Sequence, residues 1–264
     1  MKFNAILLDI ASGVATITLN RPDKLNSFTG EMHADLKQAM QIIQAEPSVR
    51  VLMITGAGRG FCAGQDLSER MMGDDGRETT DVGSSLEKNY NPLLRQLRAL
   101  PYPVICAVNG VAAGAGCNLA LACDIVIAAK SASFIQVFSR IGLIPDAGGT
   151  YTLPRLVGAA RAMAAAMLAE KIGAEQAQRW GMIWKCVDDN QLMTEATALA
   201  QQLAGQATRA LGLTKRAIYA SADNTFDQQL DLERDLQREA AKSEDFREGV
   251  TAFKEKRPAK FTGR

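Results

Sequence analysis

The sequence predicts an α/β protein whose C-terminal part is helical. Segments with the pattern of β-strands alternate with helical segments through roughly residue 130, and such alternation favours an α/β arrangement. After about Thr150 the chain is mainly helical, with one short strand-like interruption. With 264 residues, 47% of them apolar and 22% charged, the chain is long enough to bury a sizeable core.

Strands are expected where β-branched residues alternate with other residues, as Val14, Thr16 and Thr18 do. The expected strands are 3–8, 14–19, 51–55, 104–108, 124–128 and 183–187. Helices are expected where apolar residues recur at three- and four-residue steps. The expected helices are one from about Thr29 to Pro47, 86–100, the end of 110–121, 158–170, 191–205, 208–222 and 226–241.

The change from mixed to helical character near 200–210 is the visible boundary in the chain. We therefore expect a core over residues 1–205 and a helical region over 206–264, which packs on a neighbour rather than folding independently. Residues 71–85 are polar and rich in glycine, and that composition is typical of a loop.

Composition excludes several classes of protein. Lys and Arg number 30 and Asp and Glu 29, a net charge of +1, whereas nucleic-acid binding needs a basic surplus. We expect no secretion signal and no membrane segment, because the longest apolar stretch, 104–129, contains Asn109, Asn118 and Asp124. The five cysteines have no C-x-x-C spacing, so we expect buried free thiols and a cytoplasmic protein.

The chain has a single histidine, His33. This count excludes any metal site that needs two imidazoles, such as the H-E-x-x-H zinc helix. A Ser-His-Asp or Cys-His mechanism would need His33 itself. His33 lies on an expected amphipathic helix among charged residues, so we expect a surface or hydrogen-bonded side chain rather than a catalytic one.

Two glycine-rich segments each have two interpretations. Residues 56–60 follow an expected strand, but Phe61 stands where the dinucleotide-binding pattern needs its third glycine. The two remaining interpretations of this segment are a simple turn and a site for another kind of ligand. Residues 109–118 lead into an expected helix. N–H groups at its start could stabilise a negative oxygen as an oxyanion hole, or the small residues could instead allow close helix packing.

A third segment, 142–149, places one carboxylate, Asp146, among apolar and glycine residues. One interpretation makes Asp146 a general acid/base. The other is that Pro-Asp-x-Gly forms an ordinary turn, and turn statistics taken alone favour it.

Taken together, NRPDKLN (20–26), GFCAGQDL (60–67), VNGVAAGAGC (108–117) and GLIPDAGGT (142–150) resemble the crotonase (enoyl-CoA hydratase/isomerase) superfamily in order and spacing. AEQAQRWGM (174–182) and AFKEKRPAKF (252–261) extend the resemblance over essentially the whole chain. The resemblance implies an α/β crotonase spiral of ββα units with a helical C-terminal trimerisation region. It also implies an acyl-CoA thioester substrate, no separate cofactor or metal, and a homotrimer or dimer of trimers.

Site residues also follow from the resemblance. The peptide N–H groups of Gln65 and Ala115 would hold the thioester oxygen, whose developing negative charge needs such donors, and Asp146 would be the acid/base. Positions that match substrate or CoA contacts of the family are Lys24, Leu25, Ala63, Gly64, Asp66, Leu67, Gly114, Asn118, Phe138, Phe253 and Lys256.

At two positions the sequence differs from the family's hydratases, and these differences indicate which reaction to expect. Hydratases of the family carry two water-activating glutamates, and this chain has Asn118 and Phe138 at the matching positions. Because phenylalanine cannot transfer a proton, we expect isomerisation, with Asp146 moving the proton. The resemblance is strongest to the branch that converts ring-1,2-epoxyphenylacetyl-CoA to oxepin-CoA. The alternatives are a Δ3,Δ2-enoyl-CoA isomerase of fatty acid oxidation and a CoA-binding subunit without catalysis.

Overall fold

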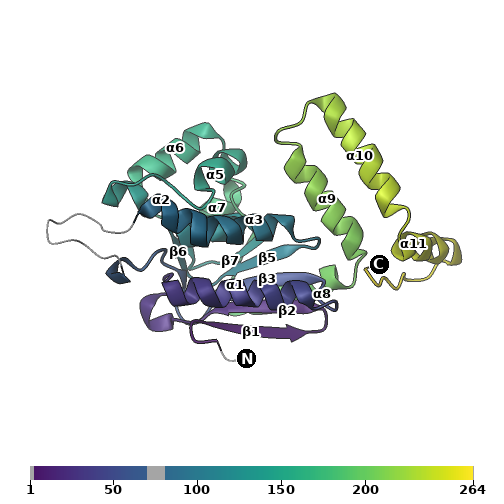
Figure 1. Ribbon diagram of the computed structural model, residues 1–264, viewed down its shortest axis with the longest axis horizontal. Coiled ribbons are helices and arrows are strands. Elements are labelled where there is room, and N and C mark those ends of the chain that lie inside the picture. Colours follow the sequence, from purple (N-terminus) through teal and green to yellow (C-terminus); the bar gives the residue numbers. More distant parts are fainter. Residues whose placement is uncertain (1–2, 70–80, 264) are drawn as a thin grey trace.

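The computed structural model describes residues 3–69 and 81–263 and is built around two β-sheets (Figure 1). Residues 71–80 of the expected loop lie outside the described residues. The described end of that segment contains the short helix α2 (Val82–Ser85). Within the described part of the chain, no helix has the length and apolar character needed to cross a membrane.

The larger sheet has six strands in the order β1-β2-β3-β5-β7-β10. They are β1 (Ile6–Ala11), β2 (Val14–Leu19), β3 (Val51–Gly56), β5 (Val104–Val108), β7 (Ile125–Ala129) and β10 (Lys185–Val187). β1 and β2 form an antiparallel hairpin, and the later neighbours pair in parallel. β3 and β5 are buried along almost their whole length, which is why their sequences are continuous apolar runs rather than alternating ones.

The smaller sheet has four short strands in the order β4-β6-β8-β9. They are β4 (Gly60–Cys62), β6 (Val111–Ala113), β8 (Ser133–Ile135) and β9 (Ile172–Gly173). The chain passes from the larger sheet to the smaller one three times, from β3 to β4, from β5 to β6 and from β7 to β8. This repeated passage agrees with the expected spiral of ββα units, and the glycine-rich segments 56–60 and 109–118 lie on the first two passages.

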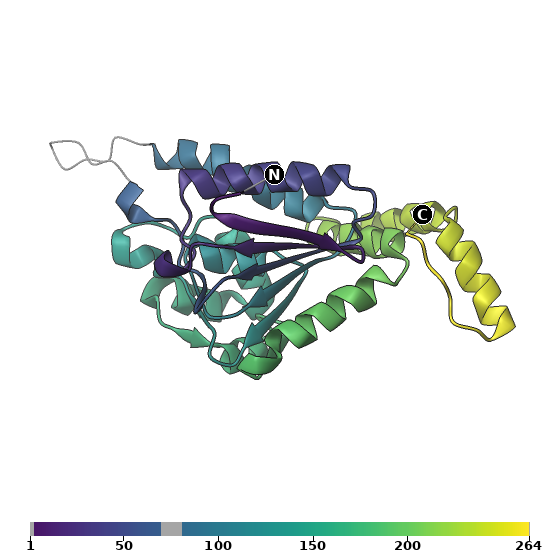
Figure 2. The same ribbon diagram turned by 90° about the horizontal axis from the view of Figure 1, so that it is seen from below.

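Helices cover both faces of the larger sheet, with α1 (Gly30–Ala45) on one face and α8 (Leu192–Ala204) on the other (Figure 2). The remaining core helices are α3 (Asn91–Ala99), α4 (Ala115–Leu121), α5 (Gly149–Val157), α6 (Ala159–Leu168) and α7 (Ala174–Arg179). Thr29 caps α1 by accepting a hydrogen bond from the Met32 N–H at 3.1 Å. Met32, Leu36 and Met40 then follow at helical spacing and are buried against the sheet.

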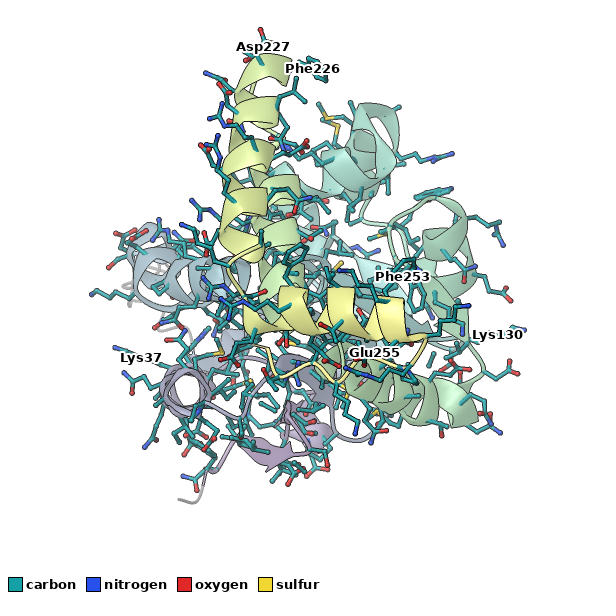
Figure 3. The ribbon with its side chains drawn as sticks, turned by 90° about the vertical axis from the view of Figure 1, so that its right-hand side faces the viewer. Lys37, Lys130, Phe226, Asp227, Phe253 and Glu255 are labelled. Atoms are coloured by element: carbon teal, nitrogen blue, oxygen red, sulfur yellow. The ribbon has the colours of Figure 1, made fainter. Side chains whose placement is uncertain are left out.

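The C-terminal helices extend away from the core on one side (Figure 1). They are α9 (Thr208–Ala220), α10 (Phe226–Ala240) and α11 (Glu244–Glu255). A buried ion pair attaches α9 to the core, because the Lys215 Nζ lies 2.8 Å from the Asp124 Oδ2 and also donates to the Leu97 carbonyl at 2.7 Å. Phe226 and Phe253 project from α10 and α11 into solvent (Figure 3).

Several expected boundaries were wrong. The first strand is Ile6–Ala11 rather than 3–8, because Ser12 and Gly13 adopt φ of 52° and 79° and form a two-residue hairpin turn that lets the strand run on to Ala11. The expected helix over 86–100 begins with a π-helical turn, Leu86–Tyr90, and becomes α-helical at Asn91. The helices α5, α7 and α11 and all four strands of the smaller sheet were not predicted from the sequence. All five thiols are free, as expected, and four are buried; the expectation of burial was wrong for Cys186, which is partly exposed on the edge strand β10.

Candidate active site

The segments 20–28 and 63–67, far apart in the sequence, pair with each other at the edge of the smaller sheet. The Ala63 N–H donates to the Leu25 carbonyl at 2.9 Å, the Phe28 N–H to the Gly64 carbonyl at 2.8 Å, and the Asp66 N–H to the Phe28 carbonyl at 2.9 Å. Phe28 and Gln65 form a parallel β-bridge. Successive N–H groups of an extended strand point to opposite sides, so the Gln65 N–H points away from Phe28.

Gly64 brings this bridge against the start of α4. It has φ of +92°, and a Cβ at this position would lie 2.9 Å from the Ala113 carbonyl oxygen and 3.6 Å from the Ala115 amide nitrogen. Only glycine suits this combination of left-handed backbone and close approach. The two peptides expected to hold the thioester oxygen are therefore neighbours in space.

The second of these peptides opens a helix. Ala115 is the first residue of α4, and Gly114 before it has φ of 53°. The first N–H groups of an α-helix have no carbonyl partner within that helix, so the Ala115 N–H is available to an acceptor from outside. The Gln65 and Ala115 peptides therefore lie close together, as the expectation of a two-donor oxyanion site requires.

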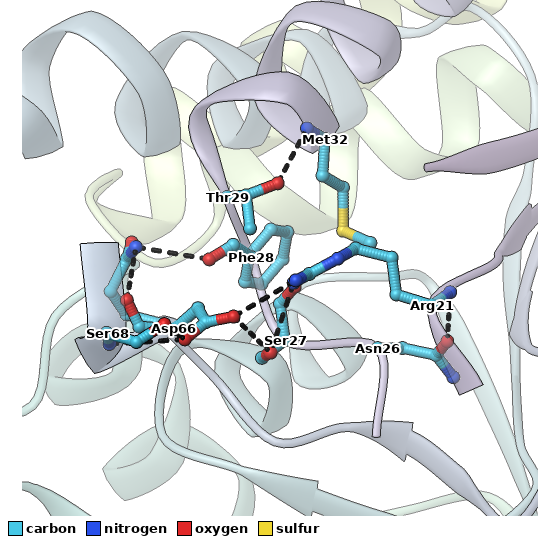
Figure 4. Close-up of polar contacts among 9 residues, drawn as sticks. Arg21, Asn26, Ser27, Phe28, Thr29, Met32, Asp66 and Ser68 are labelled. Atoms are coloured by element: carbon cyan, nitrogen blue, oxygen red, sulfur yellow. Dashed lines mark hydrogen bonds and ion pairs between the residues drawn. The ribbon is translucent and has the colours of Figure 1, made fainter. Parts of the chain in front are cut away.

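Asp66 connects the segment 63–67 to Arg21 and to Ser68. Its carboxylate forms an ion pair with the Arg21 guanidinium at 3.1 Å and accepts from the Ser68 hydroxyl at 2.6 Å (Figure 4). The Ser68 hydrogen bond, together with Arg21, lowers the pKa of Asp66 to about 2. Arg21 also donates to the Ser27 carbonyl at 2.6 Å, so the ionised carboxylate fixes the 20–28 segment. Neither Arg21 nor Ser68 was predicted from the sequence as a site residue.

Asn118 connects α4 to the segment that carries Asp146. It is 1% exposed, and its side-chain N–H donates to the Asp146 carbonyl at 2.8 Å. The Gln136 amide donates to the Asn118 Oδ1 at 2.7 Å, which orients the Asn118 amide group. Asn118 lies three residues after Ala115, a rise of about 4.5 Å along the helix, so this bond ties the Asp146 backbone to the helix that begins at Ala115.

The Asp146 segment itself is a strained turn. Ala147 and Gly148 have φ of 47° and 74°, and a non-glycine residue in this region costs on the order of 1 kcal/mol. Asp146 is partly exposed, and the Gly149 N–H closes the turn by donating to the Asp146 carbonyl at 2.8 Å. Gly149 lies so close to the Asn118 amide that a Cβ there would overlap it. The turn is therefore pressed against α4.

Phe138 contributes an apolar wall at the same place. It is buried, and its ring lies 3.7 Å from the position that a Cβ on Gly114 would take. Hydratases of the resembled family have a glutamate at the position of Phe138. Because a phenyl ring cannot transfer a proton, Phe138 cannot act as an acid or base.

The remaining expected contact residues fall into two groups. Lys24, Leu25 and Leu67 lie at the surface of the same bridge, with Lys24 and Leu67 exposed. Phe253 and Lys256 lie at the end of α11, on the opposite side of the chain (Figures 1 and 3). Phe253 is 85% exposed. The structure of one chain therefore does not bring Phe253 and Lys256 to the other site residues.

The expectation that His33 is a surface or hydrogen-bonded side chain was wrong. His33 is 8% exposed, and its Nε2 has no hydrogen-bond partner among the described residues. Burial lowers the pKa of His33 to about 4, so the imidazole is neutral near pH 7. It stacks on Phe28, with ring centroids 5.0 Å apart. The helical pattern could not show this, because the packing partner comes from the loop before the helix.

No group of three or more His, Cys, Asp and Glu side chains within 3–69 and 81–263 is placed to hold a metal ion.

The fold and the site define a class of protein. A family model described as enoyl-CoA hydratase/isomerase matches residues 9–264, and the chain belongs to this family. The chain is also similar to a solved enoyl-CoA hydratase from Bacillus anthracis, with a TM-score of 0.92 and 34% identity over 99% of this chain and all of that one. The crotonase fold is therefore confirmed.

Among characterised relatives, the chain is 56% identical to the 1,2-epoxyphenylacetyl-CoA isomerase of Escherichia coli, over 98% of each chain. It is 34% identical to the crotonyl-CoA hydratase of Syntrophomonas wolfei, over 99% of each chain. Relatives in the family thus include both an isomerase and a hydratase, and the residues at the site are needed to choose between them.

Proposed function

We propose that this chain is an acyl-CoA isomerase that converts ring-1,2-epoxyphenylacetyl-CoA to oxepin-CoA. The observation that carries the proposal is the Asn118 hydrogen bond to the Asp146 carbonyl at 2.8 Å. This bond ties the backbone of Asp146 to the helix that begins at Ala115, which supports a role for the Asp146 carboxylate as the acid/base, and Phe138 offers no second carboxylate. The 56% identity to an isomerase of this substrate supports the choice of acyl group.

The mechanism needs only groups of this chain. The thioester carbonyl oxygen accepts from the Gln65 and Ala115 N–H groups, and Asp146 takes a proton from the carbon beside the carbonyl. The electron pair moves onto the oxygen to give an enolate. The carbon–carbon bond of the epoxide breaks, its electrons join the ring double bonds and the six-membered ring widens to a seven-membered oxepin, while Asp146 returns the proton to a ring carbon. Substrate and product have the same atoms, so no water is consumed. Each oxyanion donor contributes about 10²–10³ in rate, and a positioned acid/base about 10²–10⁴.

The CoA moiety is proposed to lie along the exposed bridge, where Lys24 supplies a positive charge and Ala63, Gly64 and Leu67 the surface. Phe253 and Lys256 would reach a CoA bound by a neighbouring subunit, because they lie far from the site of their own chain (Figure 1). The helical region 206–264 would therefore assemble a homotrimer or a dimer of trimers. Its exposed Phe226 and Phe253 supply apolar surface for that contact. We propose a cytoplasmic enzyme.

The direct test replaces Asp146 by Asn and measures turnover of purified epoxide thioester. We expect kcat to fall at least 100-fold, because the general base is lost, while KM changes little. Asp223→Asn is the matched control, since Asp223 is an exposed carboxylate in the turn after α9. Unchanged turnover by Asp146→Asn would remove the assignment.

The alternative isomerase activity is distinguished with an aliphatic 3-enoyl-CoA. We expect a higher kcat/KM on the aromatic epoxide than on this thioester. The reverse order would favour a Δ3,Δ2-enoyl-CoA isomerase, and binding of CoA thioesters without turnover of either would indicate a non-catalytic subunit.

A further inference from the structure

The Gln65 side chain is held by hydrogen bonds to three groups. Its Nε2 donates to the Phe28 carbonyl at 3.1 Å and to the Asp66 carbonyl at 3.4 Å. Its Oε1 accepts from the Tyr90 hydroxyl at 2.6 Å. The backbone N–H of Gln65 is one donor of the proposed oxyanion site. Contacts that hold the Gln65 side chain therefore also restrict the orientation of this peptide.

Tyr90 reaches Gln65 because the helix that carries it is irregular. Leu86–Tyr90 is a π-helical turn, in which the Asn91 N–H donates to the Leu86 carbonyl five residues earlier. Pro92 follows within the first turn of α3, and because proline has no N–H it cannot continue the α-helical hydrogen bonds of that turn. A π-turn rotates the residues around it relative to a regular helix, and such turns occur often at functional sites. Tyr90 is only 4% exposed.

An aromatic wall fixes the Tyr90 ring. The ring lies edge-on to Phe28 at 5.2 Å and to His33 at 4.4 Å, between ring centroids. His33 is the neutral, buried imidazole described above, so this wall is uncharged near pH 7. Phe28 is also the residue whose backbone pairs with Gly64 and Asp66. The Tyr90 ring and hydroxyl therefore contact the two segments that carry the Gln65 peptide.

We propose that Tyr90 is a positioning residue for the oxyanion site and acts through Gln65. This inference rests on the proposed function. The hydroxyl holds the Gln65 side chain against the β-bridge between Phe28 and Gln65. This bridge in turn keeps the Gln65 N–H directed toward the substrate carbonyl. Tyr90 itself does not touch the substrate.

The test compares Tyr90→Phe with the wild type in two measurements. Tyr90→Phe removes the hydroxyl but keeps the ring, and we expect kcat on the epoxide thioester to fall about tenfold, as for loss of one buried hydrogen bond, with KM within twofold. The second measurement is the carbonyl stretching frequency of bound phenylacetyl-CoA, labelled at the thioester carbon. The two donors lower this frequency on binding, and we expect more than half of that shift to be lost in Tyr90→Phe.

Two further variants separate positioning from general stability. Tyr102→Phe removes another buried tyrosine hydroxyl, one without a partner among the described residues, and should leave both measurements unchanged. Gln65→Met keeps the peptide N–H but removes the acceptor of the Tyr90 hydroxyl. If Tyr90 acts through Gln65, the double variant loses no more activity than either single variant.

An unchanged carbonyl frequency in Tyr90→Phe, or additive losses in the double variant, would overturn the inference. If the wild type shifts the carbonyl frequency but does not turn over the epoxide, the proposed function is contradicted. The carbonyl frequency in Tyr90→Phe then still decides whether Tyr90 positions the Gln65 N–H. A wild-type enzyme that produces no shift contradicts both.

Discussion

Gly64→Ala is the variant for which the structure gives the most definite expectation. The new methyl group would lie 2.9 Å from the Ala113 carbonyl oxygen, closer than real Cβ contacts come, so the bridge and the start of α4 must separate by about half an ångström. That displacement moves the Gln65 N–H away from the substrate oxygen. Losing one such donor costs about 10²–10³ in kcat. The left-handed backbone adds a loss of stability of about 1–2 kcal/mol.

Gly13→Ala is the matched control, because it carries the same backbone strain without the close approach. Gly13 has φ of +79°, and its nearest contacts to an added Cβ are at 3.6 Å. We expect both variants to lose stability in urea unfolding, Gly64→Ala more than Gly13→Ala because of the added overlap with the Ala113 carbonyl, and we expect a fall in kcat on the epoxide thioester only for Gly64→Ala. If Gly64→Ala folds as stably as Gly13→Ala and keeps kcat within threefold of the wild type, the Gln65 peptide has no catalytic role.

Three further predictions concern other parts of the molecule. Asn118→Leu removes the hydrogen bond to the Asp146 carbonyl at 2.8 Å and should lower kcat about tenfold with little change in KM; an unchanged kcat would contradict the role of Asn118. The unfolded chain binds a proton at His33 near pH 6.5, but the folded chain does so only near pH 4, so the free energy of unfolding should fall by about 3 kcal/mol as pH drops through this window. His33→Leu should flatten that slope, and an equal slope in both proteins would refute the assignment to His33. Lys215→Met leaves Asp124 without its cation at 2.8 Å and should lower the free energy of unfolding by about 3 kcal/mol; a loss below 1 kcal/mol would contradict the importance of this ion pair.

The fold could be predicted from the sequence where an element is long enough to show its period. α1 and β3 were expected close to their observed positions because their apolar residues repeat over a full element. β6 and β8 have three residues each, too few for any repeat. They exist because parallel neighbours pair with them, and such tertiary pairing leaves no local signal in the sequence.

The candidate site was predicted less completely than the fold. Asp146 and the glycines of the oxyanion turn were visible as unusual segments, but their chemistry became specific only through the family resemblance. Tyr90, Gln136 and Arg21 could not be found in this way. Each acts on a residue at least 18 positions away, and Tyr90 faces inward only because of a π-turn that no hydrophobic pattern encodes.

The central claim is that one carboxylate, Asp146, moves a proton where a hydratase would add water. The most direct measurement is mass spectrometry of the products formed from the epoxide thioester in water enriched in oxygen-18. We predict a product with the mass of the substrate and no added oxygen-18, formed by the wild type and lost in Asp146→Asn. A product heavier by one labelled water molecule, or an unlabelled isomer formed equally well by Asp146→Asn, would contradict the claim.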